Sequence, residues 1–337
     1  MKRGFSFALL SVLALLCAGA AMAQPAADPF VGRWALTLPE NGAGWLGVEK
    51  DRGFLDGSLL WRGGSVLPLD AVYMEGNTLF GVRLKTVERK DAAGKVIAKQ
   101  SFPETFAFTV SGDDLKGVRT SPETDGTGLD KVEFTGKRIP ALPPAPDLSK
   151  VKYGKPVKLF NGKDLKGWKL FGGLKNGWSV SKGVLTNDPK QEEGKPHLSY
   201  GNIRTEKEFE DFNLSFEVNM TKDGNSGVYL RGIYEVQMLD SYGKPGDPHN
   251  MCSIYSRLQP LVSAEKPAGE WQTVDITLVD RHVTVKLNGQ LVQDNVALLG
   301  CTGGALWADE FRPGPIYLQG DHSGVSYRNM VLRPVVK

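Results

Sequence analysis

The residues best suited to chemistry lie in one stretch, Asn225 to Asp240, in which apolar and polar side chains alternate. Successive residues of a β-strand point to opposite faces, so the stretch would have an apolar even face and a polar odd face. The even face would pack on a core and carries Val228, Leu230, Tyr234, Val236 and Met238. The odd face carries a phenol, a guanidinium, a carboxylate and an amide, from Tyr229, Arg231, Glu235 and Gln237. This is more polar chemistry than a core strand needs.

Three glycines in and beside this stretch bear on where the polar face points. Gly224, Gly227 and Gly232 would let the strand bend at its start and in its middle, which would tilt the polar residues over a hollow. The alternative is a half-exposed strand whose polar face is solvated, and alternation by itself does not choose between the two.

Other site chemistries lack their residue patterns in the sequence. Gly224-Asn225-Ser226-Gly227 is one residue short of the Gly-x-Ser-x-Gly motif of serine hydrolases, and glycine-rich phosphate loops are absent. No His-x-x-x-His spacing indicates a metal site. Asp, Glu and His side chains gathered at one cavity could still hold a divalent ion, so the sequence leaves a metal cofactor open.

The elements that must position these residues are β-strands. The chain has 337 residues with 40 Gly, 20 Pro and 7 Trp, and long stretches with helical periodicity are few, which predicts an all-β protein. The length suits two domains with cores of their own. The formal charge of +3 falls to about +1 when residues 1–23 are removed, since Lys+Arg drops by 2 from 41 against 38 Asp+Glu. Such a charge gives no argument for nucleic acid.

The first 23 residues have the pattern of a secretory signal peptide. Lys2 and Arg3 precede an apolar run that is too short to span a membrane, and Ala21-Met22-Ala23 is a small-residue cleavage site. We therefore expect cleavage after Ala23 and a periplasmic or secreted protein with no membrane span. Cys252 and Cys301 would remain in an oxidising compartment, where they could form one disulfide or stay as two buried thiols.

Two groups of strands flank a proline-rich segment. Residues 28–138 read as short strands separated by turns and predict a small all-β accessory domain, a meander curled into a barrel or sandwich, without a catalytic cluster. Four prolines lie within residues 139–146, so residues 139–150 are expected to form a linker. Residues 151–337 form the second expected domain. Its strand at 212–220 would place Glu217 and Asn219 beside Arg231 and Glu235 on one face, and two antiparallel layers would give a jelly-roll sandwich.

From residue 155 to the C-terminus the chain resembles the 3-keto-disaccharide hydrolase domain family. The matching segments occur in the expected order and comprise 159–168, 225–232, 234–240, Glu270-Trp271, Asn288-Gly289, 314–319 with His322, and Arg328-Asn329. The resemblance does not cover residues 28–138. Two local departures are Cys252-Ser253-Ile254 ahead of Tyr255 and Gly320-Asp321 ahead of His322. The resemblance implies a concanavalin-like β-sandwich, usually exported by bacteria, that acts on glycosides already oxidised at C3 of a sugar ring, and hence a sugar 3-dehydrogenase upstream.

The implied reaction makes specific demands on the site. A ketone at C3 makes the hydrogen on C2 acidic, so a base can remove it, the enolate can expel the C1 substituent, and water can then add to the product. A base, a donor to the developing oxyanion and an acid for the leaving group are needed. As catalytic residues we expect Glu235 or Asp240 as base and His322 as acid/base or oxyanion partner. The expected contacts to substrate are Arg231, Gln237 and Gln319, with Tyr229, Tyr255 and Glu217 as further pocket residues.

A carbohydrate-binding protein without turnover is the alternative on the same fold, because sugar contact does not imply catalysis. Glu235 and Arg231 would then be an ion pair across a sheet face, Asp240 a turn residue and His322 a loop residue.

Overall fold

The computed structural model describes residues 28–336 except 174 and 193, so the expected signal peptide lies outside the described residues. Strands make up nearly all of the regular structure. Within the described ranges there is no α-helix, and the only helical elements are two 3-10 turns, η1 (Pro39–Asn41) and η2 (Leu148–Lys150). No helix in this part of the chain is long and apolar enough to cross a membrane. The prediction of an all-β protein is confirmed.

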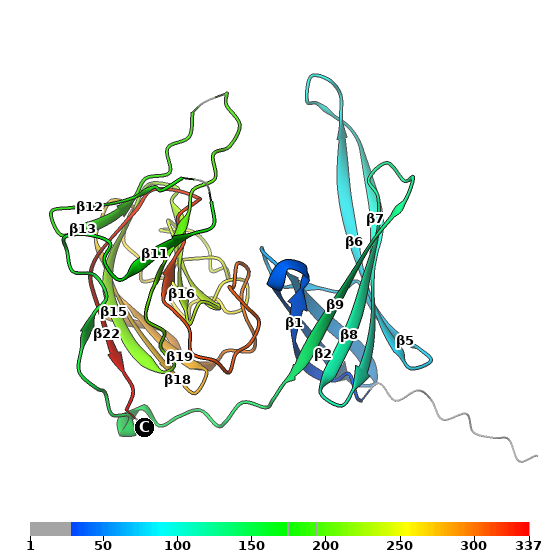
Figure 1. Cartoon of the computed structure of the whole chain (residues 1–337), viewed down its shortest axis with the longest axis horizontal. Coiled ribbons are helices and arrows are strands. Elements are labelled where there is room, and N and C mark those ends of the chain that lie inside the picture. The colour runs from blue at the N-terminus through cyan, green and yellow to red at the C-terminus, as the bar shows by residue number, and fades with distance from the viewer. Residues whose placement is uncertain (1–27, 174, 193, 337) are drawn as a thin grey trace, which may run out of the picture.

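The N-terminal strands form one antiparallel sheet in the order β4-β3-β2-β1-β9-β8-β7-β6-β5. Their bounds are β1 (Gly32–Leu38), β2 (Gly42–Asp51), β3 (Phe54–Trp61), β4 (Leu67–Pro68), β5 (Ala71–Glu75), β6 (Thr78–Lys90), β7 (Val96–Ser111), β8 (Asp114–Pro122) and β9 (Leu129–Ile139). The sheet curls around its own apolar cluster, which includes Trp34, Phe106 and Phe108. Hairpin β6–β7 projects beyond the rest of the sheet (Figure 1). This is the curled meander that the sequence predicts.

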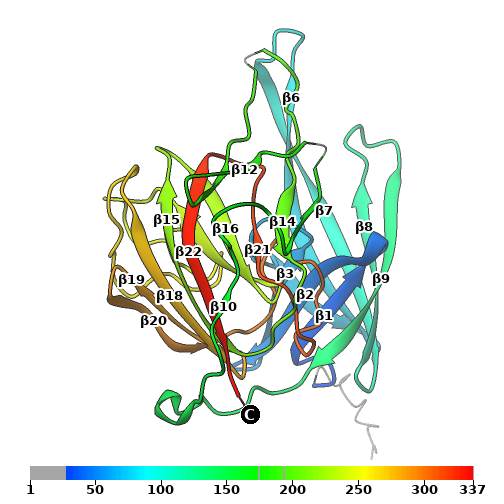
Figure 2. The ribbon, with the colours of Figure 1, turned by 60° about the vertical axis from the view of Figure 1, so that its left-hand side comes forward.

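The remaining strands build two layers that pack face to face (Figure 2). The larger layer has the path β12-β13-β22-β15-β18-β19-β20, with β10 paired to β22, and the smaller has the order β11-β14-β21-β16-β17. Their bounds are β10 (Val157–Lys158), β11 (Trp168–Phe171), β12 (Trp178–Ser181), β13 (Val184–Asn187), β14 (Asn202–Thr205), β15 (Phe212–Met220), β16 (Asn225–Leu230), β17 (Tyr234–Leu239), β18 (Gln272–Val279), β19 (His282–Leu287), β20 (Gln290–Ala297), β21 (Tyr317–Leu318) and β22 (Val325–Pro334). The apolar faces of both layers share one core, which confirms the predicted jelly-roll sandwich.

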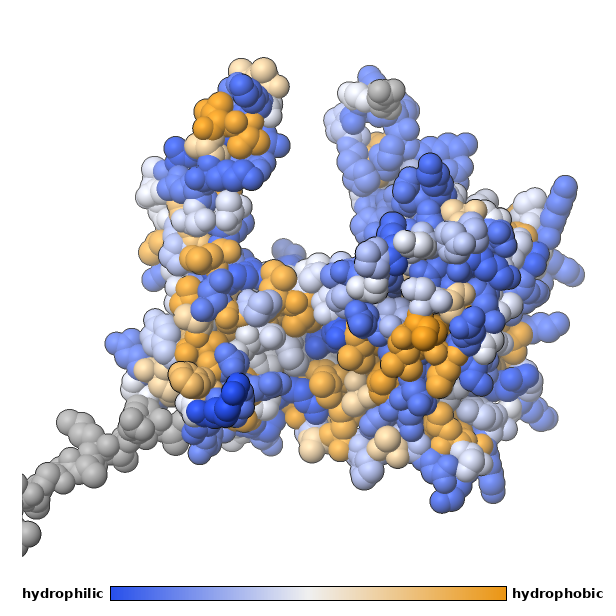
Figure 3. Space-filling view, turned by 180° about the vertical axis from the view of Figure 1, so that it is seen from behind, coloured by the Kyte–Doolittle hydropathy of each residue, from blue (hydrophilic) through white to orange (hydrophobic). Residues whose placement is uncertain are grey.

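The two parts of the chain are packed against each other. Ala43, Trp45, Leu60 and Ile139 of the N-terminal sheet belong to the same apolar cluster as the sandwich core. The guanidinium of Arg257 lies 4.4 Å from the centroid of the Trp45 ring. Hairpin β6–β7 and the loop between β13 and β14 project on either side of an open notch (Figure 3). The division into two domains at the proline-rich segment stays a prediction.

The stretch from Asn225 to Asp240 is a hairpin, so the prediction of one continuous strand is wrong. Strand β16 pairs antiparallel with β17, and the N–H of Ile233 donates to the carbonyl of Leu230 across the turn. The two residues inside this turn, Arg231 and Gly232, have φ values of 54° and 71°. Consecutive positive φ values are what a tight hairpin turn of the I′ kind requires. The sequence analysis missed this turn because the turn residues are Arg-Gly, whereas the usual sequence signal of such a turn is Asn-Gly.

Strand β15 does not lie beside this hairpin, which corrects the expectation that Glu217 and Asn219 share a face with Arg231 and Glu235. Strand β15 pairs with β18 and β22 in the larger layer, whereas β16 and β17 belong to the smaller one. Neighbours in sequence are often neighbours in a sheet, but the chain here crosses from one layer to the other between the two strands.

Candidate active site

A cavity of about 420 Å³ lies against the outer face of the smaller layer. Its lining residues come from hairpin β16–β17, from the end of β21, from three loops of the sandwich and from one loop of the N-terminal sheet. They are Gly63, Gly64, Asn225, Tyr229, Glu235, Gln237, Tyr255, Gly303, Gly304, Gln319 and His322. The cavity size is in the range of small-molecule sites. Six of the predicted site residues are thereby brought to one place.

The hairpin puts the polar residues together through its register. Tyr229 lies opposite Glu235 and Gly227 lies opposite Gln237, so all odd-numbered residues of both strands share one face. The apolar even-numbered residues of β16 and β17 belong to the sandwich core, as the alternation predicts. The predicted separation into an apolar and a polar face is therefore confirmed, although the polar face is formed by two strands.

Glu235 supplies the carboxyl group among the residues that line the cavity. Its side chain is 2% exposed, and burial raises its pKa from 4.5 to about 8, while a hydrogen bond with Tyr229 opposes the rise. The space for the carboxyl exists because residue 227 is a glycine: a Cβ added there would lie 2.1 Å from Oε1 of Glu235. A carboxyl group with a pKa near neutrality, set in a cavity, suits proton transfer.

The hydrogen bonds around Tyr229 agree with a neutral Glu235. The Tyr229 hydroxyl lies 2.8 Å from Oε2 of Glu235 and 2.7 Å from the carbonyl oxygen of Gly303. A carbonyl oxygen only accepts, and a phenol has one proton to donate. When Tyr229 donates to Gly303, the carboxyl of Glu235 must therefore donate to Tyr229. Once Glu235 is ionised, the Tyr229 proton has to turn toward the carboxylate.

A second tyrosine holds Tyr229 in place. The rings of Tyr229 and Tyr317 stack with centroids 3.7 Å apart, and the Tyr317 hydroxyl donates to the carbonyl of Gly304 at 2.8 Å. Burial raises the pKa of both phenols well above 10, so both stay protonated at neutral pH. The stacked pair fixes the phenol that contacts Glu235.

Two amide oxygens at the cavity have no partner within the described residues. Nε2 of Gln237 donates to Oδ1 of Asn225 at 3.0 Å, which leaves Oε1 of Gln237 buried and unpaired. Oε1 of Gln319 is also buried without a hydrogen bond in this part of the chain. A buried acceptor without a donor costs free energy unless a ligand or water supplies the donor. Gln237 and Gln319 both line the cavity, so a molecule bound there can supply the missing donors.

The rim of the cavity carries Tyr255 and the exposed His322. The neighbouring Asp321 is engaged elsewhere, since it accepts from the backbone N–H of Tyr200 and lies 3.3 Å from Nε2 of His197. Asp321 does not line the cavity, whereas His322 does. His322 is therefore the ionisable side chain that this loop contributes to the cavity.

Three predicted site residues lie away from the cavity. Arg231, at the hairpin turn, is 3% exposed and donates to the carbonyls of Glu310 and Arg312. Asp240 accepts from the N–H of Asp223 at 2.9 Å, the turn role that the sequence left open for it. Glu217 lies in the larger layer of the sandwich.

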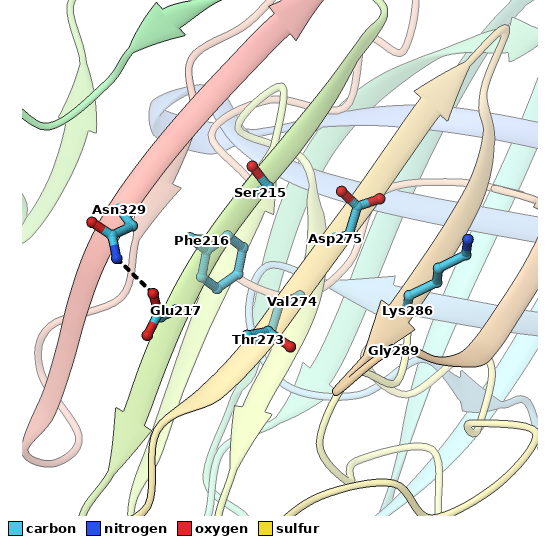
Figure 4. A pocket seen from close by; sticks show the side chains of 9 residues that line it. All are labelled: Ser215, Phe216, Glu217, Thr273, Val274, Asp275, Lys286, Gly289 and Asn329. Atoms are coloured by element: carbon cyan, nitrogen blue, oxygen red, sulfur yellow. Dashed lines mark hydrogen bonds between the residues drawn. The ribbon is translucent and has the colours of Figure 1, made fainter.

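Glu217 belongs to a second hollow, of about 350 Å³, on the larger layer (Figure 4). Partial burial opposes its ionisation, but hydrogen bonds from Asn329 and Arg328 lower its pKa below 4.5. Nη2 of Arg328 lies 2.6 Å from Oε2 of Glu217. A carboxylate held in this way stays ionised and paired at neutral pH, so it is a poor proton carrier.

The sequence analysis missed two glycine pairs, Gly63-Gly64 and Gly303-Gly304, and it missed Asn225 as a pocket residue. Gly-Gly is a visible loop signal, but nothing in the sequence says which loops meet. Cys252 and Cys301 are buried free thiols rather than a disulfide. Among the described residues no three His, Cys, Asp or Glu side chains form a group that could hold a metal ion.

Fold and site together define an all-β sandwich protein with a polar pocket built around a buried carboxyl group. The chain belongs to the family described as 3-keto-alpha-glucoside-1,2-lyase-like domain, whose model matches residues 155–333, more than half of the chain. This confirms the family resemblance. The N-terminal sheet lies outside the match.

Individual relatives are more distant. A 3-keto-disaccharide hydrolase of Bacteroides thetaiotaomicron is 24% identical over 148 residues, which cover 36% of this chain and 51% of that protein. The match therefore spans about half the length of that relative. One crystal structure of a proposed glycosyl hydrolase from Parabacteroides distasonis has 30% identity and a TM-score of 0.44, covering 59% of this chain and 94% of that one. Another from the same organism has 23% identity and a TM-score of 0.42, covering 54% and 94%.

Proposed function

We propose that this protein is an exported bacterial enzyme that cleaves 3-keto-glycosides, including 3-keto-disaccharides, by removing the proton on C2 and expelling the substituent on C1. The observation that carries the proposal is Glu235, a buried carboxyl with a pKa of about 8 in a cavity lined by unpaired amide oxygens. Membership of the keto-glucoside lyase-like family supports the substrate class. A sugar 3-dehydrogenase would have to supply the ketone.

In the proposed mechanism the carboxylate of Glu235 takes the C2 proton. The electron pair of the C2–H bond passes to the C3 carbonyl oxygen and forms an enolate. The enolate returns its electrons to form the C1–C2 double bond as the C1–O bond breaks. A group with a pKa near 8 is a stronger base than an ordinary carboxylate, which is the reason to bury it.

The other cavity residues have roles that fit their contacts. Gln237 and Gln319 would bind sugar hydroxyls through their unpaired oxygens. His322 on the rim would protonate the leaving oxygen or bind the oxyanion, and Tyr255 would contact the ring. Release of the unsaturated sugar gives a lyase outcome, and addition of water at C1 gives a hydrolase outcome.

The test is product analysis with 3-keto-trehalose and a methyl 3-keto-glucoside, with and without a chelator. Release of a free keto sugar indicates hydrolysis, a 2-hydroxyglycal indicates elimination, and chelator sensitivity indicates a metal. Glu235→Gln should lower kcat by about 10²–10⁴-fold, the usual contribution of a proton-transferring side chain. Glu217→Gln is the matched control and should retain kcat, because Glu217 lies in the other hollow. Equal losses in both variants would contradict the assignment of Glu235.

A carbohydrate-binding protein without turnover is the second candidate function, and the side-chain amides that line the cavity support it. Gln237, Gln319 and Asn225 would recognise hydroxyls whether or not a reaction follows. Binding of keto sugars by the unaltered protein, with none of them cleaved across several linkages, would select this candidate.

A further inference from the structure

One wall of the cavity is built by a part of the chain that the family match does not include. Gly63 and Gly64 line the cavity, and they belong to the loop Arg62–Ser65, which follows β3 of the N-terminal sheet. The matched segment begins only at residue 155. A sandwich with the matched segment alone would leave the cavity open on this side.

The loop is fitted closely to the sandwich. The N–H of Gly304 donates to the carbonyl of Arg62 at 3.3 Å. A Cβ added at Gly303 would lie 2.1 Å from the carbonyl oxygen of Gly64. The same Gly303 carbonyl accepts from Tyr229, the partner of Glu235. The wall is therefore in direct contact with the backbone that positions the buried carboxyl.

Side-chain hydrogen bonds fasten the other end of the loop. Oγ of Ser65 lies 2.9 Å from Nε2 of His249, and Nδ1 of His249 lies 2.7 Å from Oδ1 of Asp247. The N–H of Val66 donates to Oγ of Ser256 at 2.7 Å. His249 also packs edge-on against the ring of Tyr255, with centroids 4.9 Å apart. Tyr255 itself lines the cavity, so the fastening reaches a second cavity residue.

The apolar contact beneath the loop makes the wall rigid. Trp45 and Leu60 of the N-terminal sheet are part of the sandwich core, and Arg257 covers the Trp45 ring while donating to the carbonyl of Cys301. Packed cores resist small displacements, so a loop anchored on both sides keeps its position.

We propose that the Arg62–Ser65 loop is a specificity-determining wall of the sugar pocket, which limits the size of the group attached at C1. The inference rests on the proposed function for its ligand class. It gives the N-terminal sheet a role in substrate selection. Because the wall consists of two glycines, only backbone atoms border the cavity there. A side chain added at this wall would reduce the space available to the second sugar or aglycone.

The proposal can be tested by adding a side chain at position 63. An added Cβ at Gly63 meets no atom within 4 Å, and Gly63 is not one of the glycines with positive φ, so a side chain is compatible with the fold. The variants are Gly63→Trp and, as a matched control, Ala92→Trp in the exposed turn of hairpin β6–β7. Both are made in the Glu235→Gln protein, in which turnover is expected to be slow enough for the ligand to persist during the measurement. The ligands are methyl 3-keto-glucoside and 3-keto-trehalose, and affinity is measured by calorimetry.

Gly63→Trp should weaken binding of the disaccharide relative to the methyl glycoside by about tenfold or more, as lost space in a pocket does. Ala92→Trp should leave the ratio of the two affinities unchanged. An unchanged ratio in Gly63→Trp overturns the proposal, and so does a parent protein that binds neither ligand. Binding with the expected shift, combined with no turnover by the unaltered protein, would retain the wall and reject the enzyme.

Ser65→Ala is a second variant that adds no volume. It removes the hydrogen bond to His249 that anchors the loop, so the loosened wall should lower the KM for the disaccharide relative to that for the methyl glycoside, with kcat unchanged. Ser65→Thr keeps the hydroxyl and should restore the KM. Equal changes in KM for both substrates, or a fall in kcat without a change in KM, would contradict a role in selecting the C1 substituent.

Discussion

The buried carboxyl of Glu235 should make the stability of this protein fall as the pH rises, and Glu235→Gln should remove that dependence. Its pKa is about 8 in the folded protein and 4.5 in the unfolded chain. A carboxyl whose pKa is higher in the folded state holds its proton there while the unfolded chain releases it, so folding becomes less favourable between the two pKa values. The contribution is complete below pH 4.5 and lost above about pH 8.

The expected size follows from the two pKa values. A difference of about 3.5 pH units at roughly 1.4 kcal/mol per unit corresponds to about 5 kcal/mol over the whole range. Between pH 6 and pH 9 the unaltered protein should lose about 3 kcal/mol of unfolding free energy to this group. Glutamine has nearly the same shape and no titration, so Glu235→Gln should lack this loss.

The assay is urea unfolding at pH 6 and pH 9 for both proteins, followed by fluorescence. Other titrating groups are common to both, so the difference between the two pH dependences isolates Glu235. Glu217→Gln serves as a control and should follow the unaltered protein over this range, because the pKa of Glu217 lies below 4.5. Parallel curves for the unaltered protein and Glu235→Gln would refute the buried neutral carboxyl, and with it the reason for assigning Glu235 to proton transfer.

Three further outcomes follow from the same site and core. If Glu235 is the base, kcat/KM should rise with pH to a plateau above about 8. Tyr229→Phe should move this rising part of the pH profile to higher pH, because the hydrogen bond from Tyr229 opposes the increase in the pKa of Glu235. A kcat/KM that falls with pH would make Glu235 the acid. Gly227→Ala should destabilise the protein by about 1–3 kcal/mol in urea unfolding and lower kcat, because the new methyl would occupy the space of the carboxyl. Cys252 and Cys301 should be unreactive toward a thiol reagent until urea unfolds the protein, because both are buried and burial raises the pKa of the Cys301 thiol to about 12.

Much of the fold could be predicted from local patterns. Alternation along 212–220 and 228–238 identifies strands and their buried faces, because the two-residue period is a property of the strand alone. Asn288-Gly289 marks the turn between β19 and β20, and both residues have positive φ as that turn requires. The ordered motifs from residue 155 onward identified the family.

The candidate site could be predicted only in part. Glu235, Gln237, Tyr229, Tyr255, Gln319 and His322 were expected at a pocket and do line one. Arg231, Asp240 and Glu217 have equally suitable chemistry but lie elsewhere. The turn at Arg231-Gly232 reverses the chain and carries the guanidinium to the far end of the hairpin, and the crossing between layers separates Glu217 from Glu235.

The sequence by itself determined which residues alternate, which face of each strand is apolar, and to which family the second part belongs, because these follow from side-chain type and spacing along one segment. Only the tertiary structure decided that Glu235 is buried enough to hold a proton near neutrality and that Gly64, in the loop after β3 of the first sheet, meets Gly303 of the sandwich. Desolvation and contact depend on every segment that packs around a group, and those segments lie up to hundreds of residues apart in the chain.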